Sequence, residues 1–263
     1  MSWRHWILLL LVVGVIAAVF LFPAIPQNEA YHNFADKRGL WGVPNLLNVV
    51  SNGLFLIAGL MGVRFVGAKP PEDRATFSSP VERWAYLLFF ISVAATAFGS
   101  AYYHWRPTDG TLLWDRLPLA VGFLSLLAGL VCERTAPKNA VIYLLLLPAW
   151  GAGSVFYWYD TQENGHGDLR PYIIAQFGSM LAILLLVALF PPRYTRTGDL
   201  AIALGFYALA KIFELGDQLI FSWGGIVSGH TLKHIAAAVS AYWILRMLQR
   251  RAPVAGGVSQ PIG

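Results

Sequence analysis

Three of the six histidines stand at spacings that suit a metal site. His230 and His234 are four residues apart in one apolar segment, so a helix would place both imidazoles on the same face. His104 ends an earlier apolar segment. Imidazole is a common zinc ligand, and three protein ligands with one water make the open kind of zinc site that catalyses reactions. The sequence therefore predicts a zinc centre of His104, His230 and His234.

Two oxygen-bearing side chains accompany the histidines. Ser100 stands four residues before His104, where its hydroxyl could donate a hydrogen bond to an oxyanion formed on a carbonyl group. Asp115 lies at the expected start of the next apolar segment, where it could take a proton from water or orient a histidine N–H. We predict Ser100 and Asp115 as the catalytic residues.

Each of these residues also has a structural explanation. A histidine at the end of a spanning helix is often an interfacial side chain. Ser100 can bond back to the carbonyl of Thr96, and Asp115 can cap the helix that it is expected to begin. Pro118 weakens the capping explanation, because it removes one N–H that a cap would bind. We favour the metal site because all five residues fall at one expected depth of the bundle.

The composition indicates that membrane-spanning helices must position these residues. The chain has 263 residues, of which 57% are hydrophobic and 13% charged, with a mean hydropathy of +0.56. Soluble domains carry about 25% charged residues, whereas a spanning helix needs roughly 20 apolar ones. We read eight apolar segments, at 6–23, 45–67, 84–104, 114–132, 139–157, 171–190, 200–222 and 227–248. They predict an all-α polytopic membrane protein.

Seven of these segments form the expected helix bundle, and the first is an additional N-terminal transmembrane or signal-anchor helix. The expected domains are an N-terminal hydrophobic segment at 1–30, a seven-transmembrane hydrolase domain at 31–251 and a cytoplasmic tail at 252–263. The single Cys132 cannot form an internal disulfide. Neither the oligomeric state nor cleavage of the first helix can be read from the sequence.

The placement of basic residues predicts an orientation. The formal net charge is +5, and most of the Lys and Arg residues stand on the connections that share a side with the N-terminus. The positive-inside rule then places both termini in the cytoplasm of a multi-pass cell membrane protein, with the histidines toward the outer face. This placement explains the basic charge without a nucleic-acid partner.

Other polar and aromatic residues also lie in or near the spans. Lys211, Glu214 and Asp217 follow at intervals of three in the seventh segment. They are either a mutually neutralising structural group, supports for the zinc ligands, or the lining of a translocation path. An aromatic belt at the membrane interface accounts for Tyr102, Tyr103, Trp105 and Trp114.

The complete pattern resembles a known family. Ser100-x3-His104, then Asp115 eleven residues on, then His230-x3-His234 resembles the alkaline ceramidase branch of the CREST superfamily of membrane hydrolases. The run 48–52, Asn-Val-Val-Ser-Asn, resembles that family's N-x-x-S-N. The resemblance covers about residues 31–240. The adiponectin-receptor branch shares the same residue types but has a longer gap between His and Asp.

The resemblance implies a seven-helix bundle that holds zinc by three histidines and a water. It implies hydrolysis of the ceramide amide, with the aspartate as base and the serine stabilising the oxyanion. The eukaryotic members also bind calcium through N-terminal acidic residues. Here Asp36 is the acid available and Asn45 stands where another would be expected, so a calcium site is not expected. Asp36, Asn45, Glu214 and Asp217 are candidates for a second cation or for supporting the zinc ligands.

The sequence thus predicts a zinc-dependent intramembrane hydrolase, an amidase whose partners are a membrane and a ceramide-like lipid. A non-enzymatic receptor or transporter of the same fold is the alternative, motivated by the charges in the seventh segment. A haem held by two histidines is a third reading, motivated by His104 facing the late pair. The sequence does not specify the acyl chain or choose an amide over an ester.

Overall fold

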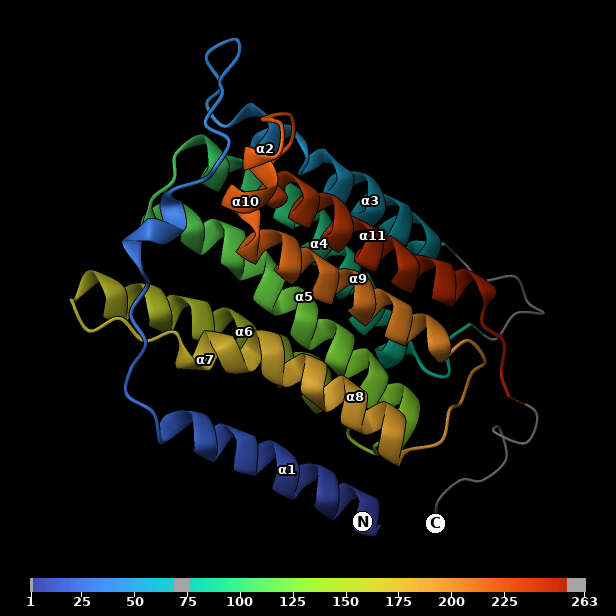
Figure 1. Cartoon of the computed structure of the whole chain (residues 1–263). Helices are drawn as coiled ribbons and strands as arrows, with labels where there is room; N and C mark the ends of the chain where they lie inside the picture. The colour runs from blue at the N-terminus through green and yellow to red at the C-terminus, as the bar shows by residue number, and fades with distance from the viewer. Residues whose placement is uncertain (1, 69–75, 255–263) are drawn as a thin grey trace.

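The computed structural model describes residues 2–68 and 76–254, and its regular elements there are helices (Figure 1). In chain order they are α1 Trp3–Phe20, η1 Glu29–His32, α2 Leu46–Val50, α3 Gly53–Gly67, α4 Pro80–Trp105, α5 Asp109–Thr135, α6 Ala140–Glu163, α7 Arg170–Ile173, a π-helical turn η2 Ile174–Gly178, α8 Ser179–Leu189, α9 Gly198–Leu215, α10 Asp217–Ser222 and α11 Gly229–Arg250. The expected all-α polytopic bundle, with its additional N-terminal helix, is confirmed.

The helices run back and forth along one common direction (Figure 1). The N-terminus of α1 and the C-terminal end of α11 lie at the same end of the bundle, and the turns before α2, α5 and α11 lie at the other. In the described ranges, six helical stretches are long and apolar enough to cross a membrane. Helix α1 lies beside α8 at the margin of the bundle and buries none of its residues.

Side-chain caps fix where the long helices begin. Ser79 accepts from the N–H of Glu82 at the start of α4, and Ser228 accepts from the N–H of Thr231 at the start of α11, both at 3.2 Å. Helix α5 begins after Thr108, which caps it in the same way. Serine and threonine hydroxyls are favoured at these positions because they satisfy an unpaired N–H.

The start of α5 corrects one expectation. The sequence placed Asp115 at the beginning of a helix, but α5 starts at Asp109 and Asp115 lies in its second turn. Thr108 caps the helix, so the capping explanation of Asp115 is wrong. The polar first turn hid this boundary, since apolar content alone was used to find the segment. Asp115 is a buried carboxylate inside a helix, which needs another explanation.

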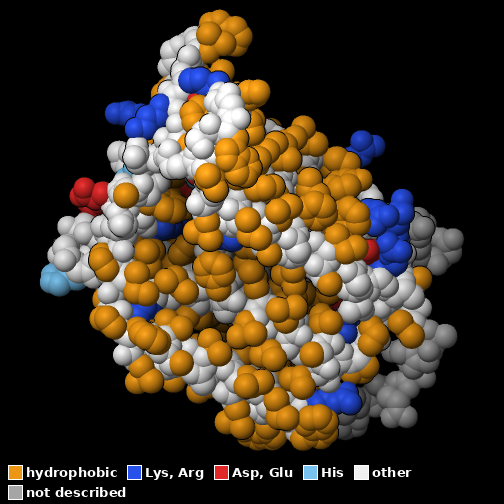
Figure 2. All heavy atoms as spheres, in the orientation of Figure 1, with side chains coloured by type: hydrophobic (Ala, Val, Ile, Leu, Met, Phe, Trp, Pro, Cys, Tyr) orange, Lys and Arg blue, Asp and Glu red, His pale blue; other side chains and the backbone are white. Residues whose placement is uncertain are grey.

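The surface is apolar where lipid would contact it. Large hydrophobic side chains are exposed along the helices, among them Ile57, Phe98 and Leu145. Figure 2 shows hydrophobic side chains covering much of the visible face, with many of the charged ones toward its margins. The apolar helices and this surface indicate a membrane protein. Lys69 and Arg74, which support the orientation, and tail residues 255–263 lie outside the described ranges.

Two clusters of buried hydrophobic residues form the interior. The larger joins α3, α4, α5, α8 and α11 through residues such as Phe90, Leu124 and Leu245. The smaller cluster lies near the end of the bundle away from the termini and includes Phe34, Tyr103 and Trp158. Tyr103 is therefore interior, and its assignment to the aromatic belt is wrong. Tyr102, Trp105 and Trp114 are exposed, as the belt requires.

The end of the bundle that holds the termini is closed by a buried ion cluster. Arg251 contacts Glu82 of α4 at 2.6 Å and Glu133 of α5 at 2.9 Å. All three side chains are buried. Because removing one partner would leave an uncompensated buried charge, this cluster fixes the end of α11 against α4 and α5. The alignment of α11 with α4 in turn determines where their histidines meet.

Candidate metal centre

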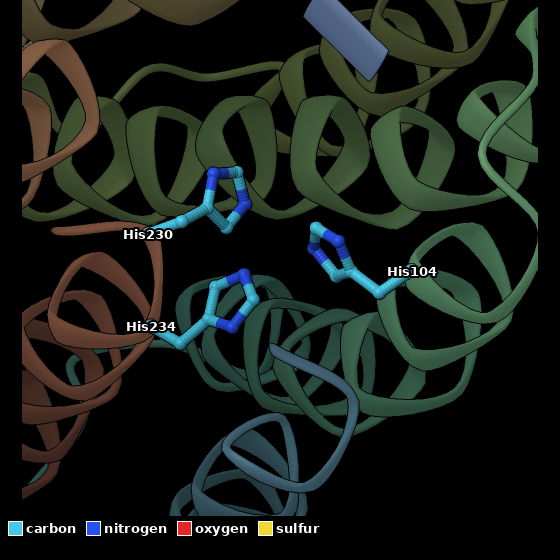
Figure 3. A group of neighbouring side chains, drawn as sticks. All are labelled: His104, His230 and His234. Carbon is cyan, nitrogen blue, oxygen red and sulfur yellow. The ribbon is translucent and has the colours of Figure 1, made fainter. Parts of the chain in front are cut away.

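Three imidazoles converge at the end of the bundle away from the termini. His104 comes from the last turn of α4, and His230 and His234 come from the first two turns of α11 (Figure 3). One ligand atom from each lies within 4.8 Å of the others. The ring centroids are 4.7 Å apart for His104 and His230, 4.9 Å for His104 and His234, and 5.0 Å for the pair on α11. The structure thus brings together the three imidazole rings that the sequence predicted to meet.

The imidazole nitrogens fit a cation. The residues are only 1%, 4% and 2% exposed, in the order His104, His230, His234. Both ring nitrogens of His104 and Nε2 of His234 are buried without a hydrogen-bond partner. Buried polar atoms nearly always have a partner, and leaving one unpaired costs about 1–3 kcal/mol. A metal ion between the rings would satisfy Nε2 of His234 and one of the two nitrogens of His104, and three neutral imidazoles are a donor set compatible with zinc.

The same crowding argues against haem. The three rings occupy a single small volume, so the third imidazole fills the space that a porphyrin plane would need between the other two. A histidine-ligated haem requires that plane to be open.

The hydroxyl of Ser51, the residue directly after α2, orients His234. Ser51 Oγ lies 2.7 Å from Nδ1 of His234 and donates to the carbonyl of Asn48 at 3.2 Å. Because the hydroxyl proton is donated to that carbonyl, Ser51 Oγ accepts a hydrogen bond from Nδ1–H, and the lone pair of His234 is on Nε2. The unpaired Nε2 faces the other two rings. The N-x-x-S-N run was noted only as part of a resemblance, and the structure gives it a physical role.

The first residue of that run fixes the start of α11. Asn48 Oδ1 accepts from Thr231 Oγ1 at 2.8 Å and from Ser228 Oγ at 3.3 Å. Gly229 lets α11 approach α9 closely, since a Cβ there would lie 2.2 Å from the carbonyl oxygen of Phe213. These contacts hold the helix that carries two of the three histidines.

Asp217 supports the centre through the backbone. Its Oδ1 accepts from the N–H of His230 at 2.7 Å, and its Oδ2 accepts from the N–H of Ala35 at 2.9 Å. The carboxylate thus satisfies an N–H in the first turn of α11 and fastens the segment before α2. Its contact with His230 is to the main chain and not to the ring.

Glu214 reaches the centre through a lysine. It accepts from Lys211 at 2.5 Å, from Lys233 at 2.6 Å and from the hydroxyl of Tyr31 at 3.1 Å. The ammonium of Lys233 also lies 3.3 Å from Nε2 of His230. A metal ion bound at that nitrogen would use the same lone pair, leaving the ammonium to Glu214. The expected Lys–Glu pair exists, and a second lysine joins it to the histidines.

Ser100 and Asp115 share one cavity with the metal centre. A cavity of about 190 Å³ is lined by both of them and by His234. Gly99 allows this arrangement, because a Cβ there would lie 2.0 Å from the carbonyl oxygen of Trp114. The backbones of α4 and α5 therefore touch beside the two predicted catalytic residues. In the described residues Ser100 makes no hydrogen bond to Thr96, which removes the structural explanation offered for it.

Asp36 and Asn45 are each occupied by other partners. Asp36 pairs with Arg38 at 2.7 and 2.8 Å, and these hydrogen bonds hold the pKa of its carboxyl below the ordinary value. Asn45 has a left-handed backbone, with φ of 48°, and donates to the carbonyl of His104 at 2.9 Å. Within the described ranges, Asp36 belongs to no cluster of His, Cys, Asp and Glu side chains with metal-ligand geometry. Asn45 instead satisfies a carbonyl in the last turn of α4.

Sequence reasoning missed Arg116 and Lys233 as parts of the site. Both line the 190 Å³ cavity. Arg116 stands only two residues inside the segment expected at 114–132, so in the sequence it resembles a charge of the adjoining outer connection. The available signals were its position two residues before Pro118 in an apolar run and the position of Lys233 between two candidate ligands.

Known proteins add nothing to this geometry. Comparisons with protein-family models, with curated proteins and with solved structures each returned no match. The function must be argued from the side chains themselves.

Proposed function

We propose that this chain is a zinc-dependent intramembrane lipid hydrolase, most simply an amidase acting on a ceramide-like lipid. The observation that carries the proposal is the meeting of three buried imidazoles, two of them with unpaired nitrogens, beside a cavity lined also by a carboxylate and a hydroxyl. The positive-inside arrangement further favours cytoplasmic termini and a site toward the outer face.

Zinc held by three imidazoles would supply Lewis acidity and would make a water molecule acidic enough to lose a proton near neutral pH. Asp115 and Ser100 line the cavity with His234. Asp115 would take that proton, and Ser100 would donate a hydrogen bond to the oxyanion formed when the water oxygen adds to the carbonyl carbon. The C–N bond would then break, and Asp115 would return the proton to the leaving nitrogen. The products are a carboxylate and an amine.

The cavities suit a lipid with one polar linkage. The 190 Å³ cavity shares Phe55, Thr96 and Leu119 with a second cavity of about 80 Å³. The second cavity is lined by apolar residues such as Phe89, Val93 and Ile183. An acyl chain in the apolar cavity would place its carbonyl in the polar one. Binding sites are commonly apolar with a few converging polar groups, as here.

The test is lipid mass spectrometry after incubating purified protein with membrane lipid extract. With Asp115→Asn we expect hydrolysis to slow by about 10²–10⁴-fold, the usual contribution of a general base. With Ser100→Ala we expect a loss of about 10²–10³-fold. Metal content should stay at the wild-type level in both variants, because neither residue is a ligand.

The matched control for Ser100→Ala is Ser154→Ala, because Ser154 is also buried but bonds to Gly151 of its own helix. It should hydrolyse lipid as the wild type does. Unchanged turnover in Asp115→Asn would refute the proposed mechanism.

A receptor or transporter remains the second candidate because Lys211 and Glu214 line the same cavity. This reading predicts that transport survives Asp115→Asn and fails in Glu214→Gln. The hydrolase proposal predicts that lipid cleavage fails in Asp115→Asn. Flux and cleavage measured on the same two variants separate the candidates.

A further inference from the structure

Arg116 is a buried cation in the second turn of α5. The residue is 5% exposed, and it follows Asp115 directly. Among the ion pairs of the described residues, none joins its guanidinium to a carboxylate within 4.0 Å. The buried Arg251 at the opposite end has two glutamate partners. Buried arginines are normally paired, so Arg116 stands apart.

The contacts of Arg116 position it without neutralising it. One guanidinium nitrogen donates to Gln27 Oε1 at 2.5 Å, which is an uncharged partner. The guanidinium lies 4.2 Å from the ring of Trp158, 4.9 Å from Tyr172 and 5.5 Å from Tyr31. Cation–π contacts of this kind contribute about 2 kcal/mol when desolvated. The other terminal nitrogen, Nη1, is buried and has no hydrogen-bond partner.

Arg116 lines the same cavity as the catalytic candidates. The walls carry three cationic side chains and two carboxylates, namely Arg116, Lys211, Lys233, Asp115 and Glu214. Glu214 is already shared by the two lysines. The cavity therefore has an excess positive charge and an unused N–H donor. A guanidinium in this setting is suited to a phosphate or carboxylate, which accepts hydrogen bonds from it.

We propose that the cavity takes a lipid whose headgroup carries an anionic oxygen group, a phosphate or a carboxylate, and that Arg116 binds this group. The inference rests on the proposed function, since it places the headgroup beside the bond to be cleaved. It keeps the amide linkage of the proposed substrate and replaces the neutral headgroup of ceramide with an anionic one. The aromatic rings hold the guanidinium in place. The anionic headgroup then provides the negatively charged partner that Arg116 lacks among the ion pairs of the described residues.

The test is competitive lipid binding to the full chain in nanodiscs, read by native mass spectrometry. The probes are a dialkylglycerol ether, its phosphate monoester and an ether lipid of the same chains with a carboxylate. Ether lipids contain no bond that the proposed reaction cleaves, so binding is measured independently of hydrolysis. We expect the wild type to retain at least one anionic probe about ten-fold better than the neutral one, as one charged hydrogen bond implies. The two anionic probes distinguish a phosphate from a carboxylate.

Arg116→Gln should abolish the preference. Arg106→Gln, which removes an exposed arginine at the same end of the bundle, should keep it. Equal retention of all three probes by the wild type overturns the proposal, and so does a preference that survives Arg116→Gln. If Arg116→Gln does not fold, Arg116→Lys replaces it. Lysine keeps the positive charge but lacks the planar set of N–H donors of a guanidinium. Arg116→Lys should therefore show a weaker preference for the anionic probes. An unchanged preference for the anionic probes would overturn the assignment of Arg116 as the anion-binding residue.

Anion preference without lipid hydrolysis in any assay would sink the proposed function and leave this inference standing. Lipid hydrolysis without a preference for anionic probes would overturn this inference and leave the proposed function standing.

Discussion

At the scale of single residues, the ligand geometry depends on groups that do not touch the metal. Ser51 fixes which nitrogen of His234 has the free lone pair. Ser51→Ala should lower zinc affinity by about 10–100-fold, the usual effect of removing a partner of a metal-ligating histidine. Competition with a chromogenic chelator measures this.

Ser125→Ala is the control for that substitution, because Ser125 is buried but bonds only to the Val121 carbonyl of its own helix. It should bind zinc as tightly as the wild type. Equal affinity in Ser51→Ala would mean that Ser51 does not orient the imidazole.

The convergence of the three histidines beside Ser100 and Asp115 could be predicted, because residues four apart share a helix face and all five positions fall at one expected depth of the bundle. His230 and His234 share a helix face at any i, i+4 spacing, and Ser100 and His104 do the same. The roles of Ser51, Arg116 and Lys233 could not be predicted, since each depends on a neighbour from a distant segment. Gln27, which contacts Arg116, lies 89 positions away in the chain.

At the scale of elements, the approach of α4 to α5 depends on one missing side chain. Gly99→Ala would push a Cβ against the carbonyl oxygen of Trp114, which belongs to the backbone and cannot turn away. Overpacking of this kind costs about 1–3 kcal/mol. We expect a lower unfolding temperature and slower lipid hydrolysis, because Ser100 and Asp115 follow the two residues that collide.

Gly153→Ala in α6 is the matched control, since a Cβ there meets nothing within 4 Å. Alanine is favoured over glycine inside a helix by about 0.5–1 kcal/mol, so this variant should be as stable as the wild type or more so. If Gly99→Ala behaves like Gly153→Ala, the two backbones are not in contact. The helices themselves were predictable from apolar length, but α5 began earlier than expected because its first turn is polar.

At the scale of the whole molecule, the distribution of basic residues predicts that both termini lie in the cytoplasm. The only cysteine, Cys132, is buried, so new cysteines can report sidedness. His166→Cys lies at the end that holds the imidazoles, and Lys138→Cys lies at the end that holds the termini. We expect a membrane-impermeant thiol reagent to label the first in intact cells and the second only after lysis. The reverse pattern would place the site at the cytoplasmic face.

The central claim is that His104, His230 and His234 hold one metal ion, and metal analysis of the purified full chain tests it most directly. The account predicts about one zinc per chain in the wild type, as for a single site with three protein ligands. It predicts loss of that zinc in His104→Ala and His234→Ala, and retention in His166→Ala, which alters an exposed histidine. Full zinc occupancy in the His104→Ala and His234→Ala variants would contradict it.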